Sequence, residues 1–370
     1  MSTIHAERIR HGVVSCTSAG LSLPEYTASV IDLLRRAVPA DSACLATTDP
    51  ATGLVTGSFK ADLEDARDEL FAHFEYEVED VNHFRELARR PDPVGVLALD
   101  TEGRPETSAR WREFLVPLFD VHQELRAAFR ADGQAWGAIG LYRTSPTSGF
   151  SPAEAAFVAD LSTEIGRGLR AAVVTSAATR DPRGAEGPAV LVVADDGTLS
   201  SITPAAEAGL SMLGPTPEGG LPFVVHALVS ACRAFRAGHL TSAPRTRVRS
   251  PSGEWFVLHA APLAATEDSR RATAVTIEPA RPPDVIPLVV AAHGLTEREQ
   301  QVVRLVLAGS PTTEIGRRLH LSPYTVQDHL KAIFDKVGVR SRRELAARVF
   351  FDQYTERMDD PLGPSGWFAG

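Results

Sequence analysis

Three polar side chains near the C-terminal end of the chain have types and spacing that could read base pairs. Gln327, Asp328 and Lys331 fall on one side of a predicted helix, opposite an apolar stripe at helical spacing. Amide, carboxylate and ammonium groups can pair with base edges in the major groove of DNA. The alternative is a solvated face on an ordinary helical bundle, and one helix alone does not separate the two. The apolar stripe consists of Val326, Leu330, Ile333 and Val337.

Four short helices that position these side chains are predicted between Leu295 and Phe350. Helix starts are marked by residues that can accept from the free N–H groups of a first turn, and glycines fall where helices stop. Only a tight turn around His320 and Leu321 separates the second helix from the third, which is the helix-turn-helix arrangement. The start signals are Thr296 with Glu299, Ser322 with Pro323, and Ser341 with Glu344, and the stop signals are Gly309 and Gly338.

A dense set of short motifs runs through residues 295–351. These motifs are Leu295 to Glu299, Glu314–Ile315 with Arg317 to Leu319, Leu321–Ser322 with Thr325–Val326, His329 to Lys331, Lys336 to Val339, and Ser341–Arg342. The pattern resembles the LuxR-type DNA-binding domain, also called the GerE or NarL type. The resemblance implies an all-α four-helix domain whose third helix enters the major groove of double-stranded DNA. It also implies a homodimer, because the fourth helix of such domains often supplies a dimer contact.

The same resemblance assigns roles to individual residues. It places Gln327, Asp328 and Lys331 at base-reading positions. A short basic run near Arg342 favours phosphate contact over plain solvation at the end of such a domain. The residues expected near phosphates are Thr312, Thr313, Tyr324, Thr325, Lys336, Arg340, Arg342 and Arg343.

Three positions depart from the family pattern. The family commonly has a basic residue where Gln327 stands, and Asp328 puts a negative charge beside the DNA. A different preferred site is therefore expected, because glutamine suits adenine and aspartate can accept from N4 of cytosine. Pro311 occupies the usual cap position of the second helix, which predicts that Ser310 or Thr312 caps it instead.

Charge separates this stretch from the rest of the chain. The 370 residues are 44% hydrophobic and carry a net charge of −9, which argues against a protein that coats nucleic acid or anionic membrane. From Ala291 to Phe351 there are ten Lys and Arg against six Asp and Glu, so this stretch carries +4 and the remainder −13. The basic stretch has the electrostatic footprint of DNA binding, and the acidic remainder favours a separate sensing role. The length suggests about two or three domains.

Neither a signal peptide nor a membrane span is predicted. No run approaches the ~18 apolar residues of a transmembrane helix, and the N-terminus lacks the apolar segment of a signal peptide. Cys16, Cys44 and Cys232 are widely spaced, so we expect buried or incidental thiols rather than a redox switch or metal site. The sequence therefore predicts a cytoplasmic protein.

An α+β domain with an antiparallel sheet is predicted over residues 21–175, after a flexible N-terminus at 1–20. It includes a hairpin around Asp132–Gly133. With Gln134 to Gly137 leading into a strand and Phe150 to Glu154 opening the last helix, it resembles a GAF sensor domain, a small-molecule-binding module. The expected elements are a helix from 22, strands 43–47 and 54–59, a helical region 63–90, a strand 94–99, a short helix with Trp111 and Phe114, strands 125–130 and 135–142, and a helix from 151 to about 174.

A second α+β domain is predicted over residues 189–280, behind a linker at 176–188. Its order of two strands, two helices and three strands resembles a PAS-like domain. A connector at 281–294 could form a short apolar helix that couples it to the DNA-binding domain, and 352–370 is predicted to be a flexible tail. The expected elements are strands 189–194 and up to 202, helices 204–213 and 222–237, and strands 245–249, 255–263 and 272–278.

An aromatic cluster in the first domain is the candidate for a ligand pocket. Several of these side chains could line an apolar cavity for a small-molecule effector. They could equally fill the core, and for any single side chain the core is favoured. The candidates are Phe71, Phe74, Phe84, Trp111, Phe119, Trp136 and Tyr142.

Signatures of catalysis are absent from the sequence. It contains no Walker A loop and no G-x-G-x-x-G, H-E-x-x-H or G-x-S-x-G motif. The carboxylates between Glu64 and Glu69 are expected on a solvated helix face, and His73 and His83 lack the i, i+4 spacing of a metal pair. The chain is therefore predicted to have no catalytic residue, no metal and no cofactor, and not to be an enzyme.

One hypothesis and one alternative follow for the whole chain. The chain is expected to be a cytoplasmic transcription regulator that binds promoter DNA as a homodimer, acts with RNA polymerase, and receives a small-molecule or protein signal in its N-terminal domains. In the alternative, those domains are only a dimerisation or protein-interaction scaffold without a small ligand. The sequence leaves open the signal, the operator, and the choice between activation and repression.

Overall fold

The chain folds into two compact units. The computed structural model describes residues 3–63, 67–175, 187–214, 220–264, 271–281, 284–285, 287–288 and 293–347. The first unit contains the described residues up to Pro279, and the second contains those from Ala280 onward. The linker predicted at 176–188, the connector at 281–294 and the tail at 352–370 lie wholly or in large part outside the described residues.

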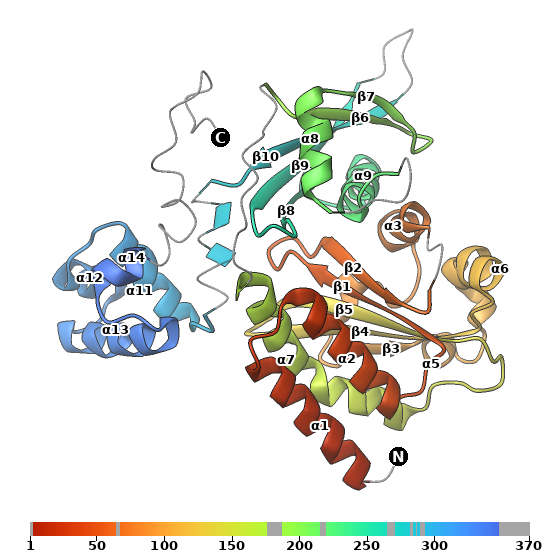
Figure 1. Ribbon diagram of the computed structural model, residues 1–370, viewed down its shortest axis with the longest axis horizontal. Helices are drawn as coiled ribbons and strands as arrows, with labels where there is room; N and C mark the ends of the chain where they lie inside the picture. The colour runs from red at the N-terminus through yellow and green to blue at the C-terminus, as the bar shows by residue number, and fades with distance from the viewer. Residues whose placement is uncertain are drawn as a thin grey trace. The chain divides into compact units, whose positions relative to one another are not determined.

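The first unit contains two five-stranded antiparallel sheets (Figure 1). The order of the first sheet is β2-β1-β5-β4-β3, with α1, α2 and α7 on one face and α3 and α6 on the other. The strands are β1 Ser42–Thr48, β2 Val55–Ala61, β3 Val94–Val96, β4 Gln123–Ala131 and β5 Gln134–Arg143. The helices are α1 Thr3–Ser18, α2 Leu23–Ala37, α3 Asp68–Tyr76, α4 Phe84–Leu87, α5 Leu97–Asp100, η1 Pro105–Thr107, η2 Trp111–Leu115, α6 Val116–Phe119 and α7 Pro152–Thr175.

The hairpin and the two flanking helices of this sheet agree with the prediction. Asp132 and Gly133 have φ values of 50° and 77°, as a tight two-residue hairpin turn requires. The backbone N–H of Ser22 donates to the Glu25 carboxylate at 3.0 Å, which is half of a capping box at the start of α2. α7 begins after Ser151, whose N–H donates to the Glu154 carboxylate at 2.7 Å.

The N-terminus differs from the prediction. Helix α1 occupies Thr3–Ser18, so the prediction of a flexible segment is wrong for these residues. Ile9 and Val13 are buried, and Arg10 donates to Asp160 of α7 at 2.7 Å. The buried stripe of α1 is narrow and lies among polar residues, which conceals its periodicity.

Two other predicted elements are shorter in the structure. The helical region predicted at 63–90 is interrupted after Tyr76, and the chain turns through Asn82, with φ of 62°, just before α4 begins. The strand predicted at 94–99 ends at Val96. The Asp100 carboxylate accepts from the backbone N–H of Val96 at 2.8 Å, which favours a turn into α5 over a longer strand.

The second sheet has the order β7-β6-β10-β9-β8 and carries α8 and α9. The elements predicted for this region agree closely with the structure. They are β6 Val190–Ala194, β7 Leu199–Ile202, α8 Pro204–Met212, α9 Phe223–Arg236, β8 Arg245–Arg249, β9 Trp255–Leu263 and β10 Ala272–Pro279.

The two sheets share a hydrophobic core. Leu54, just before β2, belongs to the same buried cluster as Leu228 of α9 and Phe256 of β9, and Tyr76 packs against that cluster. The Tyr76 hydroxyl also accepts from the backbone N–H of Val55 at 3.0 Å. Since apolar burial supplies most of the free energy of folding, the two sheets stabilise each other.

A buried ion pair also joins the two sheets. Asp49 follows β1 and is 2% exposed, and Arg247 in β8 is 7% exposed. The Arg247 guanidinium donates to the two carboxylate oxygens at 2.6 and 3.0 Å, and its backbone N–H donates to Oδ2 at 2.9 Å. This is a charge-assisted bidentate pair, the strongest kind of side-chain hydrogen bonding in proteins.

The described part of the second unit contains a four-helix domain. Val326, Leu330, Ile333 and Val337 are all buried in its core, as the helical stripe predicts. The helices are α11 Glu297–Leu307, α12 Thr312–Leu319, α13 Pro323–Val337 and α14 Arg342–Ala346.

Candidate nucleic-acid interface and aromatic cavity

A tight turn joins α12 to α13 and sets the angle between them. His320 ends α12 in the left-handed conformation with φ of 54°, and the N–H of Leu321 donates to the carbonyl of Gly316 at 2.8 Å. The Leu321 carbonyl then passes over Gly316 so closely that a Cβ there would lie 2.7 Å from its oxygen. Gly316 is therefore a residue of this turn that pattern reasoning missed, and its only signal is a glycine inside a helix.

Gly316→Ala should destabilise the four-helix domain by about 1–2 kcal/mol, because the added methyl group must push the backbone of the turn away. An ordinary glycine-to-alanine change inside a helix stabilises by up to about 1 kcal/mol. Hydrogen exchange of the α12 and α13 amides, compared between the variant and the wild-type full chain, measures the loss of stability. Unchanged or stronger protection in the variant would contradict the close packing of this turn.

The outer face of α13 presents the polar side chains that the sequence singles out. Gln327, Asp328 and Lys331 are all exposed, and Tyr324 is 77% exposed at the first turn of the helix. We call these four residues the reading face. An exposed tyrosine beside amide, carboxylate and ammonium groups supplies side chains of the kinds that contact DNA phosphates and base edges.

The helix starts of this domain are capped nearly as predicted. Thr296 and Glu299 form a reciprocal capping box, and the Ser322 hydroxyl accepts from the N–H of Thr325 at 3.0 Å. The Ser341 hydroxyl accepts from the N–H of Glu344 at 3.1 Å, but the Glu344 carboxylate binds the N–H of Arg340 rather than completing a box.

The start of α12 differs from the prediction. Its cap residue is Pro311, and neither Ser310 nor Thr312 caps it with a side chain. Instead, Arg342 of α14 donates to the carbonyl of Ser310 at 3.0 Å and to the Thr312 hydroxyl at 2.8 Å. Gln327 donates to the same hydroxyl at 3.4 Å, so α12, α13 and α14 meet at Thr312.

The predicted phosphate contacts fall into two groups. Thr313, Tyr324, Arg340 and Arg343 are exposed and free of side-chain ion pairs within the described residues. The second group has hydrogen-bond partners inside the domain. Thr325 shares a hydrogen bond of 2.8 Å with the Ser322 hydroxyl, Lys336 binds Glu299, and Arg342 binds Thr312. Their phosphate roles stay predictions, and the structure adds a positioning role for each.

Lys336 fixes α13 to α11 through the capping box. Its ammonium group lies 2.6 and 2.9 Å from the two carboxylate oxygens of Glu299, which is 5% exposed. Burial alone would raise the pKa of Glu299, but the hydrogen bonds from Lys336 and Thr296 lower it overall. The carboxylate therefore stays ionised and holds both the helix start and the lysine.

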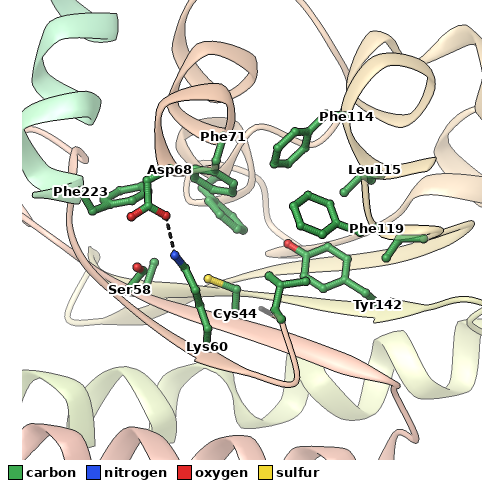
Figure 2. A pocket seen from close by; sticks show the side chains of 14 residues that line it. Cys44, Ser58, Lys60, Asp68, Phe71, Phe114, Leu115, Phe119, Tyr142 and Phe223 are labelled. Carbon is green, nitrogen blue, oxygen red and sulfur yellow. Dashed lines mark hydrogen bonds and ion pairs between the residues drawn. The ribbon is translucent and has the colours of Figure 1, made fainter. Parts of the chain in front are cut away.

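A small cavity lies in the first unit, on the face of the first sheet that carries α3 and α6 (Figure 2). Phe71, Phe84, Phe119 and Tyr142 line it, as predicted. We call it the aromatic cavity. It is also lined by ten residues that the sequence did not indicate, among them Cys44, Ser58, Lys60, Asp68, Phe114 and Phe223.

Three predicted pocket residues lie elsewhere. Phe74 is buried behind the cavity wall, with its ring 5.6 Å from that of Phe114. Trp111 donates its indole N–H to the carbonyl of His122 at 3.0 Å and holds the start of η2. Trp136 is 1% exposed and does not line the cavity; it lies in β5 at the point where the register with β4 shifts. Phe74 and Trp136 are core residues, the alternative that the sequence favoured for any single aromatic, and Trp111 is half-buried.

Buried charges lie next to the cavity. Arg126 donates to Glu75 at 2.6 Å, and its guanidinium carbon stands 3.7 Å from the ring centre of Phe84. Arg110 donates to Glu124 at 2.8 Å. Burial would raise the pKa of Glu75, but the charge of Arg126 and the contact with His83 lower it to about 2.

This carboxylate should make stability fall in acid. A folded-state pKa below the ordinary 4.5 means that the stabilisation is present above pH 4.5 and is lost as the pH falls toward 2. Its size is on the order of 3 kcal/mol. Glu75→Gln should therefore unfold at lower urea concentration at pH 7 and lose less stability between pH 5 and 3. Glu79→Gln, an exposed neighbour, is the control, and equal pH profiles for both variants would refute this role.

The described ranges contain free thiols and no cluster of side chains that could hold a metal ion. No group of three or more His, Cys, Asp and Glu side chains is placed there to hold a metal ion. Cys16, Cys44 and Cys232 are free thiols, and burial raises the pKa of Cys44 to about 11. Nor does any described helix have the length and apolarity to cross a bilayer.

The geometry of α12, the turn and α13 defines a helix-turn-helix domain with an exposed second helix. Comparison with known families identifies its kind. Residues 293–349 match the family described as bacterial regulatory proteins, luxR family. This part of the chain is therefore a LuxR-type helix-turn-helix domain, as the sequence motifs predict.

Curated relatives match the same part of the chain. The chain is 47% identical over 51 residues to the putative HTH-type transcriptional regulator Mb0914c of Mycobacterium bovis. This match covers 14% of this chain and 6% of that protein. The chain is 43% identical over 56 residues to the transcriptional regulatory protein UhpA of Escherichia coli strain K12, which covers 15% of this chain and 29% of UhpA. The match thus spans only a small part of either relative.

Solved structures resemble a larger part of the chain, but weakly. The bacteriophytochrome RpBphP3 from R. palustris is 12% identical with a TM-score of 0.34, covering 75% of this chain and 63% of that one. VqmA of Vibrio cholerae is 16% identical with a TM-score of 0.22, covering 44% of this chain and 81% of that one. Scores of this size do not establish a shared fold.

Proposed function

We propose that this chain is a sequence-specific transcription regulator that binds promoter DNA as a homodimer through α13. The observation that carries the proposal is the reading face, which is exposed on the second helix of a LuxR-type helix-turn-helix. The surrounding stretch is also the basic part of an acidic chain, which supports attraction to phosphates. A soluble cytoplasmic location follows from this role.

The first unit would be the sensor in this proposal, with residues 21–175 as a GAF-like domain and 189–280 as a PAS-like domain. Two antiparallel sheets with helices on their faces and a cavity in one of them support this assignment. A signal would act by binding two conformations of the chain unequally, one of which has the higher affinity for DNA. In an activator, the DNA-bound form would also contact RNA polymerase.

A gel-shift titration with promoter fragments from the host genome tests the DNA-binding part. The expected result is a site-preferring complex whose affinity falls steeply with salt, because phosphate contacts release counterions. A footprint with two equivalent half-sites is expected for a dimer. Binding that shows no preference between fragments, or no salt dependence, would rule the proposal out.

A scaffold without a small ligand is the second candidate for the first unit. The aromatic cavity favours it, since its free volume of about 30 Å³ holds only about one or two water molecules. A metabolite panel distinguishes the two, because a ligand of the native state raises its melting temperature. The scaffold would be favoured if no metabolite of the panel raised the melting temperature and the full chain formed a stable dimer through its first unit.

A further inference from the structure

The aromatic cavity is closed by a residue from the other half of the first unit. Of the described residues that line it, all but Phe223 belong to the first sheet or to the segments packed on it. Phe223 is the first residue of α9, and its ring centre lies 5.6 Å from that of Phe71 (Figure 2). Occupancy of the cavity and the position of α9 are therefore coupled.

The free space in the cavity is too small for a ligand with even a single ring. Ligand pockets usually enclose at least about 300 Å³, and about 30 Å³ is free here. A ligand must therefore take the place of a side chain. Phe223 is half-buried and sits at a helix end, so displacing its ring costs less free energy than displacing the buried rings of Phe84 or Phe114.

The polar atoms at the cavity define which ligand would fit. Tyr142 is 4% exposed, and its hydroxyl has no hydrogen-bond partner within the described residues. Burial raises its pKa, so it stays a neutral donor. Lys60 and Asp68 on the opposite side bind each other at 2.5 Å and so cancel their charges (Figure 2). This lining suits an uncharged molecule with one hydrogen-bond acceptor.

We propose that Phe223 is a built-in plug of the aromatic cavity, and that the signal is a small neutral planar molecule that replaces its ring and accepts a hydrogen bond from Tyr142. The inference rests on the proposed sensing role and adds the class of the signal and the helix that responds to it. Residues of α9 pack in the core of the second sheet, so displacement of Phe223 acts directly on that half of the unit.

Phe223→Ala in the full chain tests the plug, with Phe235→Ala as the matched control. Both changes remove the same atoms from α9, but Phe235 lies at the other end of the helix and does not line the cavity. The probe is acetophenone, a neutral ring with a carbonyl acceptor, measured by calorimetric titration. It should bind the Phe223→Ala variant at least about tenfold more tightly than it binds the wild type or the control, because no ring has to be displaced.

Two further probes test the ligand class. Cumene has nearly the same size but no acceptor and should bind the Phe223→Ala variant several-fold more weakly, since the Tyr142 hydroxyl is then left unpaired. Benzoate carries a charge and should bind more weakly still. Adding Tyr142→Phe should weaken acetophenone about five- to tenfold and leave cumene nearly unchanged.

The response of α9 can be measured in the wild type. Acetophenone at saturation should increase hydrogen exchange in the first turns of α9 and leave α7 unchanged. Equal affinity of the two alanine variants, or equal affinity for the three probes, would overturn the plug. Where Phe223→Ala does not fold, Phe223→Leu makes the same comparison with a smaller void. A gel shift with the same preparation tests DNA binding separately, so failure of the plug and failure of the regulator are distinguishable.

Discussion

Replacing Lys331 with alanine is expected to lower the affinity for the preferred operator by about ten- to a hundredfold, while affinity for unrelated DNA changes by less than about threefold. The side chain is exposed on α13 and has no ion-pair partner within the described residues, so the folded domain does not depend on it. A base contact made by such a group discriminates by about 1–3 kcal/mol. Fluorescence anisotropy with operator and scrambled duplexes at one salt concentration measures both affinities.

Arg340→Ala is the matched control for this experiment. Arg340 is exposed, and only its backbone N–H is bound, by Glu344. Its loss should weaken binding to all DNA sequences alike. The slope of log affinity against log salt concentration should fall by about one, the contribution of one phosphate contact. Arg342 is less suitable, because it also holds Ser310 and Thr312 at the start of α12. If Lys331→Ala weakened operator and scrambled DNA equally, the assignment of Lys331 to base reading would fail.

Asp49→Ala is expected to destabilise the first unit by about 3–5 kcal/mol, the usual effect of removing one partner of a buried ion pair. The substitution removes three hydrogen bonds that Arg247 donates, and it leaves a buried guanidinium without its carboxylate. Urea unfolding of the full chain, followed by tryptophan fluorescence, measures the change.

Asp195→Ala removes a comparable pair at the surface. Arg236 donates to both carboxylate oxygens of Asp195, but the two side chains are 30% and 37% exposed. Water screens such pairs, and their loss costs at most about 1 kcal/mol. If the two aspartate variants were equally stable, the contact between Asp49 and Arg247 would contribute little to joining the sheets.

Local signals predicted the second unit and the second sheet well. Caps, stop glycines and a buried stripe are each properties of a few neighbouring residues, so α11 and α13 could be placed from sequence. The hairpin at Asp132–Gly133 of the first sheet could be placed for the same reason. The same approach failed where tertiary contacts decide. Helix α1 is stabilised by burial against α7, and the chain turns at a left-handed Asn82 between α3 and α4.

Only part of the lining of the aromatic cavity could be predicted, because the rest depends on tertiary contacts. Large aromatic residues suggest a pocket by their type, which indicated Phe71, Phe84, Phe119 and Tyr142. Ser58 and Lys60 line the cavity because the pleat of β2 points alternate side chains to one face, which requires the register of the sheet. Phe223, which lies 81 residues after Tyr142 in sequence, also lines the cavity, and no local pattern encodes that proximity.

The shared core around Leu54 and Tyr76 limits how this protein could have been assembled. Each half of the first unit covers apolar surface of the other, so either half alone would expose an apolar patch to water. Exchange of one half for that of another regulator would expose this surface and leave Arg247 without Asp49. In evolution, the two sheets are therefore expected to be exchanged between proteins only together. The helix-turn-helix has its own core and can be exchanged by itself.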